Sequence, residues 1–362
     1  MRETLETVTV DLGPRSYDIF IGRGLLGSLG DRIKSTGLHG RAGILTNDTV
    51  GPIYGKRAAE SIRGAGYEVS TLSLPDGEKF KTIESMARIY DWLLKEGFDR
   101  KSFVVALGGG VIGDMAGFAA ATFMRGIDFV QVPTTLLAQV DSSVGGKTGV
   151  NRPLGKNMVG AFHQPRLVLA DVDTLNTLPK EEFVSGLAEV VKYGVIRDAE
   201  FFSWLEDNAE AVLEMKPKAL AHLIKTSCEI KAEVVGADER EGGLRAILNF
   251  GHTVGHAVES LTDYTGYRHG DAVAIGMAAA ARLAHAQGLC GPEVPERLMA
   301  LLSRFGLPTE FPKNLDPDSV LKSIGHDKKA ENGRVKFVLP ERIGKVVITK
   351  EWGDEKLTGA LG

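Results

Sequence analysis

Three histidines and one acidic residue carry the clearest chemical signal in this chain of 362 residues. His252 and His256 are four residues apart, so a helix would place both imidazoles on one face. His269 follows shortly afterwards, and Glu189 lies upstream in an apolar segment, where a buried carboxylate needs a partner. Two imidazoles and one carboxylate form a typical Zn²⁺ site with an open coordination position. The spacing predicts a metal site, and it leaves open which of these residues are ligands.

A glycine-rich segment over 108–114, GGGVIGD, follows an expected strand and opens an expected helix. Glycine lets the backbone approach a pyrophosphate closely, and the N-terminus of a helix supplies N–H donors. The spacing departs from GxGxxG, so the standard dinucleotide fingerprint is absent. Glu78, in the segment 76–81, is a candidate acceptor for a ribose hydroxyl. Together the two segments favour dinucleotide binding over a plain glycine-rich turn.

A second segment rich in glycine and serine, 141–157, contains Lys147 and Lys156. We expect a long irregular loop here, and such loops within compact domains are usually functional. GGKT resembles part of a P-loop, but GxxxxGK[ST] requires glycine where Asp141 stands. A cationic pocket for a phosphate or carboxylate is the preferred interpretation, and a solvated surface loop is the alternative. Other cations that would suit a polyanionic substrate beside a metal are Arg125, Lys192, Lys231, Arg245 and those of 327–329.

The elements that must position these residues change in type near residue 178. In the first half, strands are expected over 7–12, 17–22, 42–46, 67–72 and 103–107, and helices over 23–35, 52–64 and 82–96. This order predicts a Rossmann-like α/β domain, with a mostly parallel sheet and helices on both faces. Later segments have helical periodicity, near 180–194, 198–213, 217–236, 244–263, 270–288 and 292–304, before a β-hairpin over 334–349. We expect a cofactor-binding α/β domain over 1–177 and a mostly α-helical metal- and substrate-binding domain over 178–362.

Composition limits the partners and the location. Lys and Arg number 43 against 47 Asp and Glu, and the net charge of −4 argues against a nucleic-acid binder. Cys228 and Cys290 cannot form a disulfide framework, and the N-terminal residues lack the features of a signal peptide. The longest apolar stretch, 103–124, is interrupted by Asp114 and by glycines. We therefore expect a cytoplasmic protein without a membrane span.

Seven segments resemble, in order, those of the 3-dehydroquinate synthase family within the sugar-phosphate cyclase superfamily. They are PDGEKFK, GGGVIGDMAGFAAATFMRGI, QVPTTLLAQVDSSVGGKTGVN, GKNMVGAFHQP, GLAEVVKYGVI, LNFGHTVGHAVE and HGDAVAIGM. The resemblance implies a homodimer with bound NAD⁺ and one divalent metal, Zn²⁺ or Co²⁺. It implies a lyase of the shikimate pathway that converts 3-deoxy-D-arabino-heptulosonate 7-phosphate to 3-dehydroquinate and phosphate. The implied steps are transient oxidation by NAD⁺, β-elimination of phosphate, reduction, ring opening and aldol closure.

The resemblance also implies roles for individual residues. The metal ligands would be Glu189, His252 and His269. The NAD⁺ contacts would be Asp76, Gly77, Glu78, Lys79, Phe80, Lys81, Gly110, Val111, Ile112, Gly113, Asp114, Thr134, Thr135, Lys147, Lys156, Thr174, Leu175, Asn176 and Thr177. Contacts to the substrate and its phosphate would be Arg125, Asp141, Lys147, Asn157, Lys192, Lys231, Arg245, Asn249, His256 and Lys328, with Lys329 as an alternative to Lys328.

Three alternative functions stay open at this point. A metal-dependent polyol dehydrogenase of the glycerol type shares the two spaced histidines followed by HG[DE], but its carboxylate ligand is usually Asp. Glu189, together with Lys147, Lys156 and Lys192, favours the cyclase. A cyclase for another sugar phosphate, such as sedoheptulose 7-phosphate, is the second alternative, although Arg245 and Lys231 suit a substrate carboxylate. The third is a metal-stabilised binding protein, which would turn over no substrate.

Overall fold

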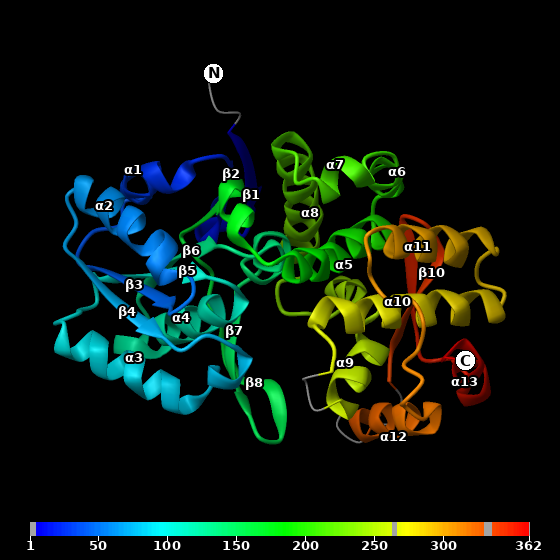
Figure 1. The fold of residues 1–362 in the computed structure, drawn as a ribbon. Coiled ribbons are helices and arrows are strands. Elements are labelled where there is room, and N and C mark those ends of the chain that lie inside the picture. Colours follow the sequence, from blue (N-terminus) through cyan, green and yellow to red (C-terminus); the bar gives the residue numbers. More distant parts are fainter. Residues whose placement is uncertain (1–4, 263–265, 329–334, 362) are drawn as a thin grey trace. The chain divides into compact units, whose positions relative to one another are not determined.

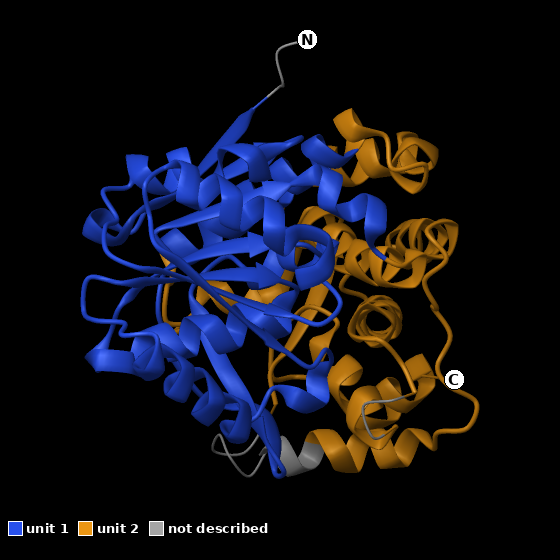
Figure 2. Cartoon of the chain, turned by 60° about the vertical axis from the view of Figure 1, so that its left-hand side comes forward, with its two compact units in different colours: residues 1–178, 220–236 blue, residues 179–219, 237–362 orange. Residues whose placement is uncertain are grey.

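The chain divides into two compact units in the computed structural model, which describes residues 5–262, 266–328 and 335–361. Unit 1 contains residues 1–178 and 220–236, and unit 2 contains residues 179–219 and 237–362; Figure 2 draws them in blue and orange. Most of α8 (Pro217–Ala237) therefore belongs to unit 1, although it follows helices of unit 2 along the chain. The expected assignment of domain functions to 1–177 and 178–362 stays a prediction.

Unit 1 is built around a seven-stranded sheet (Figure 1). In spatial order its strands are β1 (Glu6–Val10), β2 (Tyr17–Gly22), β9 (Leu167–Asp171), β6 (Asp128–Pro133), β5 (Phe103–Gly108), β3 (Ala42–Asn47) and β4 (Val69–Leu74). β1 pairs antiparallel with β2, and the other neighbouring pairs are parallel. The predicted mostly parallel sheet is confirmed.

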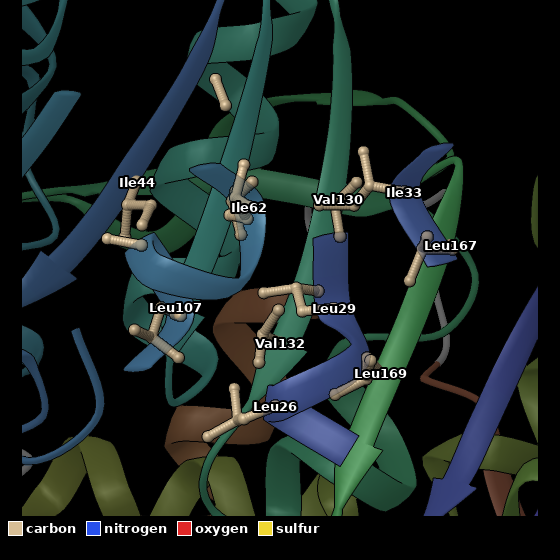
Figure 3. Packing of buried hydrophobic residues seen from close by; sticks show 14 of the residues in the cluster. Leu26, Leu29, Ile33, Ile44, Ile62, Leu107, Val130, Val132, Leu167 and Leu169 are labelled. Atoms are coloured by element: carbon tan, nitrogen blue, oxygen red, sulfur yellow. The ribbon is translucent and has the colours of Figure 1, made fainter. Parts of the chain in front are cut away.

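Helices cover both faces of this sheet. Neighbouring residues of one strand point to opposite faces, so a single strand contributes to the apolar cluster on each side. Ile44 belongs to the apolar cluster that contains α1 (Leu29–Ser35) and α2 (Lys56–Gly64). Leu45 belongs to the cluster that contains α3 (Ile83–Lys95) and α4 (Gly110–Thr122). Figure 3 shows the first cluster, where side chains of α1 and α2 pack on β5, β6 and β9. Burial on both faces explains why the central strands are continuous apolar runs.

The segment 141–157 is not the irregular loop that the sequence predicts. After a short π-helical turn, η6 (Ala138–Ser142), the chain forms a hairpin of β7 (Lys147–Arg152) and β8 (Gly155–Phe162). Gly149 lies opposite Gly160 in this pair. A Cβ atom on Gly160 would lie 2.0 Å from the carbonyl oxygen of Thr148, so only glycine permits this approach of the strands. These glycines, which the sequence pattern suggests are loop residues, thus allow the two strands to pair closely.

Unit 2 is mostly helical, as predicted, and ends with a small hairpin. Its helices are α5 (Lys180–Ile196), α6 (Ala199–Asp207), α7 (Ala209–Leu213), α9 (His252–Leu261), α10 (His269–Ala286), α11 (Glu293–Arg304), α12 (Pro317–Lys328) and α13 (Asp354–Leu361). The hairpin consists of β10 (Phe337–Arg342) and β11 (Lys345–Thr349). Among the described residues of the chain, no helix has the length and apolar character needed to cross a membrane.

The prediction of one continuous helix over 244–263 is wrong. A 3-10 turn, η8 (Leu244–Asn249), comes first, and α9 then begins at His252. Gly251 separates them with φ +81, a left-handed conformation that favours glycine. A Cβ atom at Gly251 would lie 2.5 Å from the Cγ of Met277, so the close approach of α10 also requires glycine here. This break decides where on α9 the histidines lie.

Candidate active site

Glu189 is a fully buried carboxylate in the middle of α5, a helix that is buried along most of its length. Lys192, three residues later on the same face, forms an ion pair with Glu189 Oε2 and is itself 2% exposed. Burial of a charge is costly unless a partner compensates it, and the pair supplies that compensation inside one helix.

Two imidazoles approach the same carboxylate. The Nε2 atoms of His252 and His269 each lie 3.5 Å from Glu189 Oε1. His252 Nδ1 lies 3.1 Å from the carbonyl oxygen of Phe250, which directs its Nε2 towards Glu189. The candidate ligand atoms of the three residues lie within 4.8 Å of one another. Two imidazole nitrogens and one carboxylate oxygen fit a divalent cation such as Zn²⁺ and leave a coordination position for substrate.

The two histidines have opposite pKa shifts. Burial lowers the pKa of His252 to about 3, against the attraction of Glu189. Burial alone would also lower the pKa of His269, but hydrogen bonding to Glu189 and Glu259 outweighs it and raises that pKa to about 10. His252 is therefore neutral at pH 7, which is the form of imidazole that ligates a metal.

His256 lies one turn after His252 on α9 and is exposed. Its ring centroid is 5.3 Å from that of His252 and 6.4 Å from that of His269. The cluster of candidate ligand atoms contains Glu189, His252 and His269, and His256 borders it. The geometry thus separates the four residues that spacing left equivalent, and the roles of all four stay predictions.

The turn between α8 and η8 was not singled out in the sequence, and it organises two predicted substrate residues. Asp238 accepts hydrogen bonds from the backbone N–H groups of Gly242, Gly243 and Arg245, at 2.8, 2.7 and 3.0 Å. These bonds, that from Arg245 first, lower the pKa of Asp238. The Arg245 side chain is buried and donates to the carbonyl oxygen of Glu239. The sequence signal that could have indicated this turn is an acidic residue shortly before two adjacent glycines.

Asn249 also has a defined partner in unit 2. Its Nδ2 donates to Glu241 Oε1 at 3.0 Å, and Glu241 adopts a left-handed backbone with φ +62. Neither Glu241 nor this bond was expected from the sequence. Lys328 is the last residue of α12, and its side chain lies outside the described residues, as does Lys329.

The predicted cofactor segments share one edge of the sheet in unit 1. Residues 76–81 follow β4, 110–114 begin α4 after β5, 134–135 follow β6, and 174–177 follow β9. These strands are parallel, so their carboxyl ends meet at one edge, where ligands of open α/β sheets bind. A Cβ atom at Gly109 would lie 3.0 Å from Thr135 Cγ2, which shows how closely two of the segments approach.

A polar network around the buried Lys81 links these segments to the β7–β8 hairpin. Lys81 is 4% exposed, and its Nζ donates to Asp114 Oδ2 and Asn157 Oδ1, both at 2.5 Å. Burial raises the pKa of Asp114, although Lys81 opposes the shift. Asn151 Nδ2 donates to Glu78 Oε1 at 2.7 Å. Glu78, the predicted ribose acceptor, therefore accepts a hydrogen bond from the hairpin. Residue spacing along the sequence could not indicate this contact.

Other expected residues of unit 1 have defined positions. Asn47 Nδ2 donates to Asp76 Oδ1 at 2.7 Å. Lys231, on α8, donates to the carbonyl oxygen and the Oδ1 of Asp141, at 2.6 and 2.8 Å. Arg125 is exposed at the end of the turn after α4, with φ +69. Lys147 begins β7, and Lys156 lies near the start of β8, so both belong to strands rather than to an irregular loop.

Comparisons with known proteins cover most of the chain. Residues 71–185 match the family described as 3-dehydroquinate synthase N-terminal, and residues 186–330 match 3-dehydroquinate synthase C-terminal. A 3-dehydroquinate synthase of Pelotomaculum thermopropionicum is 55% identical over 344 residues, which are 95% of this chain and 93% of that protein.

Two solved structures have closely similar folds. A 2-deoxy-scyllo-inosose synthase complexed with carbaglucose-6-phosphate, NAD⁺ and Co²⁺ gives a TM-score of 0.90 at 29% identity, over 98% of this chain and 99% of the other. A 2-epi-5-epi-valiolone synthase from Streptomyces hygroscopicus subsp. jinggangensis 5008, with NAD⁺ and Zn²⁺ bound, gives 0.87 at 29% identity, over 95% of both chains.

Proposed function

Because the chain belongs to the 3-dehydroquinate synthase family, we propose that its cluster of Glu189, His252 and His269 holds the divalent metal of that reaction, Zn²⁺ or Co²⁺. The function is that of a 3-dehydroquinate synthase, a lyase of the shikimate pathway. The observation that supports the metal assignment is the pair of imidazole nitrogens at 3.5 Å from one buried carboxylate oxygen. A divalent cation at this position would bind substrate hydroxyls and make one of them more acidic.

We propose that NAD⁺ binds at the carboxyl edge of the sheet in unit 1, through the segments 76–81, 110–114, 134–135 and 174–177 and through Lys147 and Lys156. Bound there, NAD⁺ would supply a transient hydride acceptor that is not consumed overall. Gly109 and Gly110 leave the start of α4 open for a phosphate group, since they place no side chain before its N–H donors. On this proposal residues 1–177 form the NAD-binding domain, and 178–362 form the metal- and substrate-binding domain.

The substrate of this reaction carries a phosphate and a carboxylate, whereas the chain has a net charge of −4. Binding must therefore depend on local cations, and charge-assisted hydrogen bonds are the strong kind. Two of the proposed cations are held in place: Lys231 by Asp141, and Arg245 by the turn that Asp238 organises. The proposed substrate contacts are Arg125, Asp141, Lys147, Asn157, Lys192, Lys231, Arg245, Asn249, His256 and Lys328.

The leaving phosphate gains negative charge as its C–O bond breaks. Cations beside it therefore stabilise the transition state more than the bound substrate, which raises turnover. His256 is exposed at the border of the candidate metal cluster, and an imidazole is a common general acid or base in catalysis. We assign it to substrate binding and proton transfer rather than to the metal.

The decisive experiment measures phosphate release from 3-deoxy-D-arabino-heptulosonate 7-phosphate, with NAD⁺ and metal varied separately. We expect phosphate to accumulate with catalytic amounts of NAD⁺, while NADH absorbance stays at a small plateau. NADH that rises in proportion to product would indicate net oxidation and a polyol dehydrogenase. Sedoheptulose 7-phosphate serves as the competing substrate, and faster release of phosphate from it would indicate the other type of cyclase.

The family also supports a cytoplasmic homodimer, which we propose for this chain. Light scattering coupled to size-exclusion chromatography measures the mass of the assembly directly. A mass of one chain at the concentrations used for the activity assay would contradict the dimer.

A further inference from the structure

Glu259 is a second buried carboxylate beside the metal cluster, and the proposed reaction gives it no role. It lies in the last turn of α9, and its side chain is 5% exposed. Burial disfavours a carboxylate, and so does the C-terminal end of a helix, where the helix dipole is negative. Neither the helix nor the apolar core therefore explains an acidic residue here, so its interaction partner must.

One partner among the described residues is a candidate metal ligand. Glu259 Oε1 lies 3.6 Å from Nδ1 of His269. Glu189 Oε1 lies 3.5 Å from Nε2 of the same ring. Two carboxylates thus bracket one imidazole, each facing one of its two nitrogens. When a cation is bound, a proton on Nδ1 that points to Glu259 leaves the lone pair of Nε2 for that cation.

The backbone of His269 is fixed by contacts of its neighbour. Gly270 N–H donates to Ser185 Oγ at 3.0 Å, which ties the start of α10 to α5, the helix that carries Glu189. A Cβ atom at Gly270 would lie 1.9 Å from the carbonyl oxygen of Ser185, so the two helices touch closely. These contacts do not involve the imidazole ring, and the χ2 torsion of a histidine is broad and nearly two-fold. A flipped ring would turn a carbon edge towards Glu189.

The position of Glu259 along α9 is suited to this task. His252, His256 and Glu259 occupy positions i, i+4 and i+7, so one face of the helix carries all three side chains. The same helix thus contributes a proposed ligand and a carboxylate that faces the other histidine. Metal-binding histidines commonly donate their second ring N–H to a carboxylate, which sets the tautomer and the ring orientation.

We propose that Glu259 is a positioning residue of the metal site, where its carboxylate accepts the Nδ1–H of His269 and directs Nε2 towards the cation. This inference rests on the metal site proposed above. It concerns the affinity for the metal, and the overall reaction needs no additional step.

The test measures binding of Zn²⁺ and Co²⁺ alone, to metal-free protein, by competition with a chromophoric chelator. Removal of such a partner typically lowers metal affinity about 10- to 100-fold, and we expect a loss in this range for Glu259→Leu. Glu259→Gln keeps an oxygen that can accept the Nδ1–H, so its loss should be clearly smaller. The visible absorption of bound Co²⁺ should shift in Glu259→Leu, since the ligand geometry changes. Ser260→Ala, an exposed neighbour on the same helix, is the matched control and should bind as the unmodified chain does.

Thermal unfolding of the metal-free variants separates a role at the metal from a role in folding. Unchanged metal affinity in Glu259→Leu, with or without a lower melting temperature, would overturn the inference. If Glu259→Leu does not fold, Glu259→Ala, which also removes the acceptor, is measured in its place. An affinity within twofold of the unmodified chain together with an unshifted Co²⁺ spectrum would then overturn the inference. Glu189→Gln tests the proposed metal site separately. Tight metal binding in that variant would reject the site itself, and this inference with it.

Discussion

Lys192 neutralises Glu189 within a single buried turn of α5, and the carboxylate also faces the imidazoles of His252 and His269. The ion pair keeps the Glu189 carboxylate ionised inside the protein, where it can ligate a divalent cation. It also couples the stability of the unit to the candidate metal site.

Glu189→Gln should therefore lose the metal, because a neutral amide is a poor ligand. It should also destabilise the protein by about 3–5 kcal/mol, since Lys192 is left buried without its charged partner. The double variant Glu189→Gln/Lys192→Met should recover much of the free energy of unfolding but no metal. Elemental analysis and urea denaturation measure the two effects. Full metal occupancy in Glu189→Gln would reject this residue as an essential ligand.

The three histidines should behave differently when each is replaced. His252→Ala and His269→Ala should abolish metal binding, because each removes one of the imidazole nitrogens near Glu189 Oε1. His256→Ala should keep its metal and lose turnover, since its ring borders the cluster and is exposed. Metal content and the rate of phosphate release are measured on the same samples. Equal metal loss in all three variants would make His256 a ligand.

Asp238 should make stability depend on pH in a defined direction. Backbone hydrogen bonds, led by that from Arg245, lower its pKa below the value of about 3.9 for an unfolded aspartate. The ionised group therefore stabilises the fold above pH 4, and this contribution is lost as the pH falls through the lowered pKa. The difference in unfolding free energy between the unmodified chain and Asp238→Asn should be present at pH 6 and shrink towards pH 3. A difference that grows on acidification would contradict this assignment.

Lys147→Ala should lower kcat/KM about 10- to 150-fold, which corresponds to the roughly 1.5–3 kcal/mol of a hydrogen bond to a charged group. Part of the loss should appear in kcat, since the phosphate gains charge in the transition state. Thermal stability should change little, because Lys147 is exposed on β7. Arg152→Ala removes an exposed cation from the same strand and is the control. An unchanged kcat/KM in Lys147→Ala would restore the solvated-surface interpretation.

Gly160→Ala should disrupt the β7–β8 hairpin, because the added Cβ would lie 2.0 Å from the backbone oxygen of Thr148. We expect a loss of at least about 1–3 kcal/mol in unfolding free energy, the usual cost of inserting an atom into a filled space. Gly64→Ala, at the end of α2, meets no atom within 4 Å and should be neutral or slightly stabilising. Urea denaturation compares the two variants. Equal stabilities would indicate that the strands separate at little cost.

The amino-acid sequence by itself determined the class of the fold and the residue types of the candidate metal cluster. The apolar runs at Ala42–Asn47 and Phe103–Gly108 alternate with helical segments, and this local order is enough to predict a parallel sheet. The four-residue spacing of His252 and His256 likewise places both on one helix face, because helix geometry is local. The seven motifs in register were sufficient to identify the family.

The tertiary structure decided the relations between residues that are distant along the chain. Local propensity treats glycines as loop residues, so the pairing of Gly149 with Gly160 in a hairpin could not be predicted. Spacing also could not show that Gly251 ends the expected long helix before His252, since that glycine is required by the approach of α10. The bonds of Asn151 to Glu78 and of Lys231 to Asp141 each join segments more than seventy residues apart. Such contacts arise from packing of whole elements, which no local pattern encodes, and the same is true of Glu259 beside His269.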